Sequence, residues 1–111
     1  MQQSTKEKIM QLQTLEQRMQ NLLLQKQNFQ TQTLEVENAL AELKNGKGET
    51  YKIIGNVMIA MKKEELKKDL TNRKEILDLR VKSLEKEEEK TKNASSILQE
   101  EVMKELKKKD G

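Results

Sequence analysis

Residues 51–61 most constrain how this chain can fold, because they place a short apolar segment between two long, highly charged stretches. The two-residue loop Gly55-Asn56 suits a type II′ hairpin turn, since Gly tolerates a positive φ. Apolar residues would then occupy both faces of the hairpin, with Lys52 as the main polar exception. A lone two-stranded hairpin is only marginally stable in water, and its open edges invite pairing. We therefore expect other chains to complete this hairpin, and the function to depend on an assembly.

The turn also predicts the register of the two strands. Ile54 pairs with Val57, and the pairs Ile53–Met58, Lys52–Ile59 and Tyr51–Ala60 follow from it. The alternative to assembly is a loop insertion packed on its own helices. We favour assembly, because one hairpin cannot bury both of its faces against one pair of helices. The residues assigned to the oligomerisation hairpin are Tyr51, Ile53, Ile54, Gly55, Val57, Met58, Ile59 and Met61.

The stretch 5–44 is predicted to be a coiled-coil helix. The chain contains no Pro, so nothing interrupts a long helix. Apolar residues recur at alternating spacings of three and four from Leu12 to Leu43, and Lys26 and Thr33 are the polar interruptions. The helix is expected to end with Gly46 in the left-handed conformation.

A second helix is predicted over residues 63–109, after the hairpin at 50–61. Its apolar seam runs from Leu66 to Leu84 and includes Arg73, and no apolar side chain occurs in residues 85–93. Two helices of similar length around a short insertion should fold back on each other as an antiparallel coiled coil. The fold class is therefore mainly α, with one hairpin, and we treat residues 1–111 as a single domain.

Composition excludes an ordinary globular core, because 33% of the residues are hydrophobic, 2% are aromatic and 37% are charged. Long helices have this composition. Full-length disorder is disfavoured, because the apolar residues are regularly spaced. The net charge of +3 arises from interspersed acids and bases. We therefore expect no nucleic-acid partner, although a nucleic-acid-binding helical protein is one rival class.

The chain lacks the side chains that most catalytic and metal sites require. It has no Cys and no His, which excludes disulfides and Cys/His metal sites. The run Glu87-Glu88-Glu89 is interpreted as a solvated helix face, because no core is available to desolvate it. No Gly-rich phosphate loop is present. We expect no enzyme activity, no catalytic residues, no cofactor and no metal.

No apolar run approaches the roughly 20 residues that span a bilayer. The N-terminal residues 1–6 lack the apolar core of a signal peptide. The chain is therefore expected to be cytoplasmic, with no membrane partner.

The residues Tyr51-Lys52-Ile53-Ile54-Gly55-Asn56-Val57-Met58-Ile59, followed by Lys63-Glu64-Glu65-Leu66, resemble the central signature of β-type prefoldin subunits. Residues 77–88 and the Gln-rich residues 22–27 are also similar to the helices of that family. The resemblance covers essentially the whole chain. The hairpin signature is the more specific part, since coiled-coil segments alone are weak indicators of a family.

The resemblance implies an ATP-independent holdase co-chaperone. In the archaeal form, two α-type and four β-type subunits build a hexamer, and their hairpins join into a double β-barrel platform. The coiled coils extend from this platform as tentacles, hold unfolded proteins at their tips and pass them to a group II chaperonin. The resemblance favours the archaeal β-type subunit, with the similar eukaryotic subunit 6 type as the alternative.

The helix ends carry apolar residues beyond a single stripe, which suits client capture, and Met adapts well to varied partners. The alternative is that Leu12, Leu98 and Val102 only close the seam. Lys107, Lys108 and Lys109 are assigned either to chaperonin contact or to helix-end charge and solubility. A structural coiled-coil scaffold without clients is the other rival class. The predicted client-binding tip residues are Ile9, Met10, Leu12, Ile97, Leu98, Val102, Met103 and Leu106.

Overall fold

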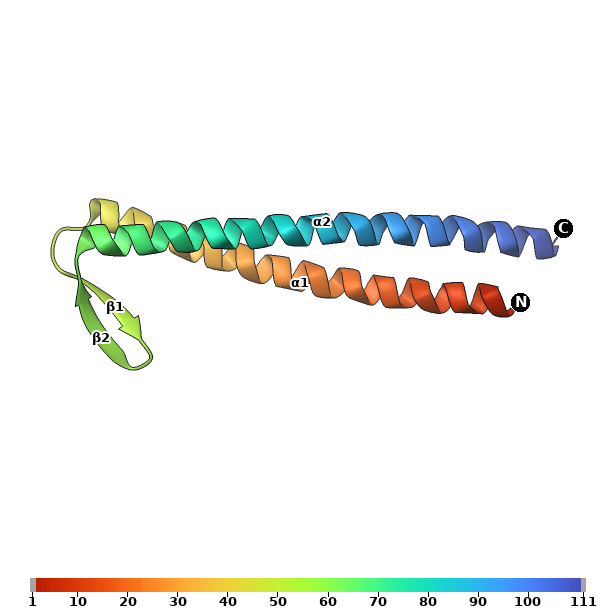
Figure 1. The fold of residues 1–111 in the computed structure, drawn as a ribbon, viewed down its shortest axis with the longest axis horizontal. Coiled ribbons are helices and arrows are strands. Elements are labelled where there is room, and N and C mark those ends of the chain that lie inside the picture. Colours follow the sequence, from red (N-terminus) through yellow and green to blue (C-terminus); the bar gives the residue numbers. More distant parts are fainter. Residues whose placement is uncertain (1, 111) are drawn as a thin grey trace. The chain divides into compact units, whose positions relative to one another are not determined.

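The computed structural model describes residues 2–110, and their side chains as far as residue 108. Its elements, in order, are α1 (Gln3–Asn45), β1 (Thr50–Ile54), β2 (Val57–Met61) and α2 (Lys63–Asp110) (Figure 1). The helices contain 43 and 48 residues, and the two strands form one antiparallel sheet. The predicted fold class of two long helices joined by one hairpin is confirmed.

The chain divides into two compact units. We call Asn28–Val81 the hairpin unit, and Met1–Gln27 with Lys82–Gly111 the terminal unit. Each unit contains a segment of α1 paired with a segment of α2. The treatment of the chain as one domain stays a prediction.

The hairpin unit is held by a narrow apolar seam in which Val36, Leu43 and Leu77 are buried. The assignment of Arg73 to this seam was wrong, because Arg73 is exposed and its neighbour Lys74 is half-buried. Lys74 can occupy this position because its aliphatic stem packs against apolar surface while its charge reaches the edge of the seam. Its ammonium lies 3.3 Å from the Glu37 carboxylate.

Polar groups share the seam of the terminal unit with the buried side chains of Leu22 and Val102. Thr91 is buried and donates its hydroxyl hydrogen bond to the Glu87 carbonyl, so it carries no unsatisfied donor into the seam. Lys26 lies 2.9 Å from Glu88 Oε1, with both side chains mostly buried. The stretch without apolar residues is therefore closed by polar side chains.

The end of α1 differs from the prediction. The helix ends at Asn45, but Gly46 does not have a positive φ; Gly48 does, at 124°. Gly46 is required for a different reason, because a Cβ there would lie 2.8 Å from the Glu42 carbonyl oxygen. That oxygen accepts a hydrogen bond from the Gly46 N–H, and Lys63 Nζ donates to the Gly46 carbonyl. Lys63 thus satisfies the first backbone carbonyl after the end of α1.

The predicted register of the hairpin is confirmed. Ile54 lies opposite Val57, and the pairing continues to Thr50 opposite Met61. Gly55 has a φ of 60°, while no non-glycine residue among those described has a positive φ. A positive φ at the first loop position alone is the requirement of a type II′ turn.

Candidate assembly and client-binding surfaces

The hairpin exposes apolar side chains on both of its faces. One face presents Ile53 and Met58, which are 67% and 63% exposed. The other presents Ile54 and Val57, at 56% and 59%. Within the described residues the sheet has only two strands, so each strand has an unpaired edge (Figure 1). The sequence correctly indicated a hairpin that its own chain does not cover.

The base of the hairpin is anchored, although its faces are open. Lys52, the one charged residue of the strands, lies 2.6 Å from Asp69 on α2. Thr50 Oγ1 donates a hydrogen bond to the Met61 carbonyl across the strand ends. The ion pair joins the hairpin to α2, and the hydrogen bond joins the ends of the two strands. Neither contact covers the apolar faces of the hairpin.

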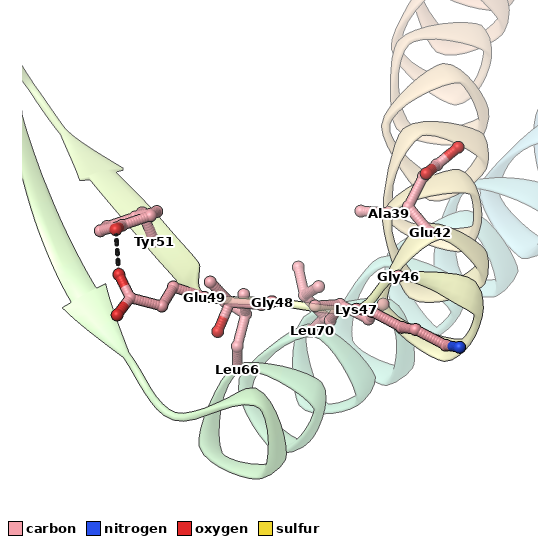
Figure 2. Close-up of a pocket in the computed structure, with 11 residues that line it drawn as sticks. Ala39, Glu42, Gly46, Lys47, Gly48, Glu49, Tyr51, Leu66 and Leu70 are labelled. Atoms are coloured by element: carbon pink, nitrogen blue, oxygen red, sulfur yellow. Dashed lines mark hydrogen bonds between the residues drawn. The ribbon is translucent and has the colours of Figure 1, made fainter.

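Beside this base is an apolar recess of about 420 Å³ within the hairpin unit. Figure 2 shows Leu66 and Leu70 of α2 and Ala39 of α1 around it, with the connector between α1 and β1 crossing it. The Tyr51 hydroxyl donates a hydrogen bond to the Glu49 carboxylate at the rim. This bond, together with partial burial, raises the pKa of the Tyr51 phenol above its usual value. The recess could not be predicted from the sequence, because the path of the connector decides whether it exists.

The two helix ends meet in the terminal unit, as the predicted tip requires. Met10, Ile97 and Met103 are exposed, whereas Val102 is buried in the seam. The other four predicted tip residues are half-buried. These are Ile9, Leu12, Leu98 and Leu106.

A polar network that the sequence analysis missed also joins the two helices at this tip. Lys8 Nζ lies 2.6 Å from a Glu105 oxygen and 3.3 Å from the Glu101 carboxylate. Thr5, which is buried, donates its hydroxyl hydrogen bond to the other Glu105 oxygen at 2.5 Å. These partners lower the pKa of the Glu105 carboxyl, and the Glu105 hydrogen bond raises the pKa of Lys8. The signal was available, because Thr5 and Lys8 continue the three-four spacing of the seam beyond Leu12.

Several exposed apolar residues lie outside both predicted surfaces. Leu23, Leu24 and Leu34 on α1, and Ile76 and Leu79 on α2, are exposed. They lie beside the seam positions rather than on them, and the sequence analysis did not single them out.

The tail lysines lie at the end of α2. Lys107 and Lys108 are exposed, and the side chain of Lys109 lies outside the described part of the structure. Contact with a chaperonin stays a prediction for all three.

Within residues 2–110 there is no group of three or more acidic or metal-ligating side chains placed to hold a metal ion. No helix in this part of the chain is long and apolar enough to cross a membrane. The cytoplasmic location stays a prediction.

Comparison with known proteins identifies the family. The family model described as Prefoldin subunit matches residues 6–109. Prefoldin subunit beta of Archaeoglobus fulgidus is 34% identical over 96 residues, which cover 85% of this chain and 83% of the relative. Prefoldin subunit beta of Pyrobaculum neutrophilum is 36% identical over 95 residues, covering 84% and 75% of the two chains.

The fold is also found in a solved structure. The crystal structure of the prefoldin beta subunit from Thermococcus strain KS-1 superimposes with a TM-score of 0.88 at 24% sequence identity, covering 95% of this chain and 94% of the other. The open hairpin and the paired helices are thus features of a known architecture. The chain therefore belongs to the prefoldin subunit family, and within it the chain is similar to the β-type subunits.

Proposed function

We propose that this chain is the β-type subunit of an ATP-independent holdase, which binds unfolded proteins and transfers them to a group II chaperonin. The family role of a prefoldin co-chaperone supports the proposal. The observation that carries it is the hairpin, whose two exposed apolar faces and two open edges require partner chains.

The partners that fit this hairpin are α-type subunits and further copies of the chain, in a hexamer of two α and four β. Joining strands edge to edge into a closed barrel satisfies the backbone groups of the open edges. It also places one apolar face of every hairpin inside the barrel. The anchoring of Lys52 to Asp69 supports this arrangement, because it holds the strands in one orientation on α2.

Client binding is assigned to the tip of the terminal unit. Met10, Ile97 and Met103 present apolar side chains there, and the seam does not need them for its own closure. Flexible methionines suit contacts with many different apolar sequences. The proposed role involves no catalysis, nucleotide or metal.

The test is the aggregation of a chemically unfolded, unrelated protein, followed by light scattering without nucleotide. The chain is assayed alone and mixed with an α-type prefoldin subunit. We expect suppression that strengthens with the partner. Removing residues 1–10 and 95–111 should abolish suppression and leave the hexamer intact, as judged by its mass. Unchanged suppression by the truncated hexamer would locate client binding elsewhere.

Assembly is tested separately with Ile53→Lys combined with Ile59→Lys. Placing two charges on the apolar hairpin should leave monomers or aggregates, because a buried unpaired charge strongly destabilises an interface. The matched control is Ile76→Lys combined with Leu79→Lys, at exposed positions on α2. A hexamer that survives the hairpin change would exclude the hairpin as the assembly surface.

A structural scaffold without clients is the second candidate. The observation that favours it is the network of Thr5, Lys8 and Glu105, which closes the tip of the helix pair. A closed tip is what a fixed tether needs. An ordered hexamer that suppresses no aggregation would support the scaffold and refute the holdase.

A further inference from the structure

The hairpin unit has a second recess that none of the surfaces above uses. Its volume is about 450 Å³, and its apolar lining comprises Leu40, Ala41 and Leu43 of α1. Leu43 also lines the recess beside the base of the hairpin, which we call the hairpin-side recess. One buried side chain therefore separates the two recesses. Both lie at the junction where α1 ends and α2 begins.

Helix geometry places the two recesses on different sides of α1. Residues Ala39, Glu42 and Gly46 line the hairpin-side recess, while Ala41 and Lys44 line the second one. With 3.6 residues per turn, Ala39 and Glu42 lie about 60° apart around α1, and Ala41 and Lys44 lie roughly opposite them. Leu43, which lines both recesses, lies between the two directions. A single partner molecule docked at one recess therefore leaves the other open.

The charges around the two recesses are opposite in sign. The residues that line the hairpin-side recess include two acids, Glu42 and Glu49, and one base, Lys47. The second recess, which we call the basic recess, is lined by three lysines and no acidic residue. These are Lys44, Lys63 and Lys67.

The basic recess also has uncompensated charge. Lys63 donates a hydrogen bond to the Gly46 carbonyl, but among the described residues neither Lys44 nor Lys67 lies within ion-pair distance of a carboxylate. Glu64 and Glu65 lie in the first turn of α2 and offset the positive potential of this helix N-terminus, but neither of them lines the recess. An apolar recess bordered by the unpaired Lys44 and Lys67 is complementary to an apolar surface that carries carboxylates.

We propose that a second copy of this chain supplies that surface, so that the basic recess of one copy packs against the hairpin-side recess of the next. This pairing rests on the proposed assembly, since it is a second contact between the copies that the hairpins bring together. The two recesses are complementary in charge and are both lined by apolar side chains. The contact joins different surfaces of identical chains, which is the heterologous geometry that closes into rings when the rotation permits. The hairpin-side recess includes Thr50 and Tyr51, so it is continuous with the proposed hairpin interface.

The experiment exchanges the charges of the two recesses. The first variant carries Lys44→Glu and Lys67→Glu; Lys63 is kept because it donates a hydrogen bond to the Gly46 carbonyl. The second carries Glu42→Lys and Glu49→Gln, and the amide still accepts the Tyr51 hydrogen bond. A third chain carries all four changes, which reverses both recesses and restores their complementarity.

Each full-length variant is assembled with the α-type subunit, and its mass is followed on dilution. Two surface ion pairs contribute up to about 1 kcal/mol each, so each two-change variant should dissociate at a concentration on the order of tenfold higher than the unchanged chain. The chain with all four changes should recover most of this loss. Raised salt should reduce the difference between the unchanged chain and the two-change variants. Helix content by circular dichroism verifies that every variant is folded.

The matched control is Lys86→Glu with Lys90→Glu, which makes the same charge change on an exposed stretch of α2 outside the hairpin unit. Equal effects of this control and the first variant would overturn the proposal. Loss in the first variant without recovery in the four-change chain would also overturn it, and would indicate an acidic occupant other than a second copy. If the hairpin substitutions dissociate the hexamer and the charge reversals do not, the proposed function stands and the recess pairing falls. A chain that does not assemble at all refutes both.

Discussion

The seam of the terminal unit offers a direct test of where the stability of this fold resides. Leu22 is 4% exposed, whereas Leu24, two residues further along α1, is 64% exposed. Leu22→Ala removes three carbon groups from the seam, at about 0.8 kcal/mol each, or roughly 2.4 kcal/mol. A cavity cost adds to this loss in an enclosed core, but a seam between two helices is open at its sides. We therefore expect a decrease of about 2–3 kcal/mol in the free energy of unfolding.

Leu24→Ala is the matched control, with the same chemistry on the same helix. Only about a third of this side chain is removed from water, so its replacement should cost less than about 1 kcal/mol. Both losses are measured by urea unfolding followed by circular dichroism of the helices. The free energy of unfolding should fall with urea concentration at the same slope in both variants. Equal losses in the two variants would refute the assignment of Leu22 to a buried seam. An effect of Leu24→Ala on aggregation suppression alone would instead indicate a contact with clients.

Two further predictions concern the polar groups between the helices. Because the pKa of Glu105 is lowered, its ionised carboxylate contributes stability that is fully present above pH 4.5, the ordinary pKa, and is lost as the pH falls through the lowered pKa. Because the pKa of Lys8 is raised, the stability that its ammonium contributes is lost only above pH 10.5. Between pH 7 and pH 3 the melting temperature should therefore fall more steeply in the unchanged chain than in Glu105→Gln. In the exposed control Glu100→Gln it should fall as steeply as in the unchanged chain. An equal fall in all three chains would contradict the network. Glu88→Leu should cost about 1–3 kcal/mol by urea unfolding, because it leaves Lys26 without its partner, whereas Lys26→Met combined with Glu88→Leu should return close to the original stability. A combined variant as unstable as the single one would show that the pair itself stabilises the seam.

The hairpin and the helices could be predicted because their rules are local. The loop Gly55-Asn56 determines the register, and the observed pairing of Ile54 with Val57 follows from it without any contact to the helices. The spacing of apolar residues predicts the seam from Leu12 to Leu43, because a helix turns by a constant angle per residue.

The two errors have different causes. Arg73 was assigned to the seam by spacing, but Lys74 lies there, and its ammonium is 3.3 Å from Glu37 of the partner helix. Gly46 was expected to be left-handed, but the close approach of the Glu42 carbonyl makes a glycine necessary instead. Only the ion pair of Lys74 with Glu37 joins two helices, whereas the contact of Gly46 with Glu42 lies within the end of α1 and the residue that follows it.

The sequence by itself determined the two helices, the hairpin with its register and the exposure of apolar groups on both hairpin faces, because these follow from turn chemistry and periodicity. The tertiary structure alone decided which polar side chains enter the seam, such as Lys26 with Glu88, and which network closes the tip around Glu105. It also decided that two recesses of opposite charge flank Leu43. These features depend on the distance and rotation between two helices, which the packing of many side chains sets together.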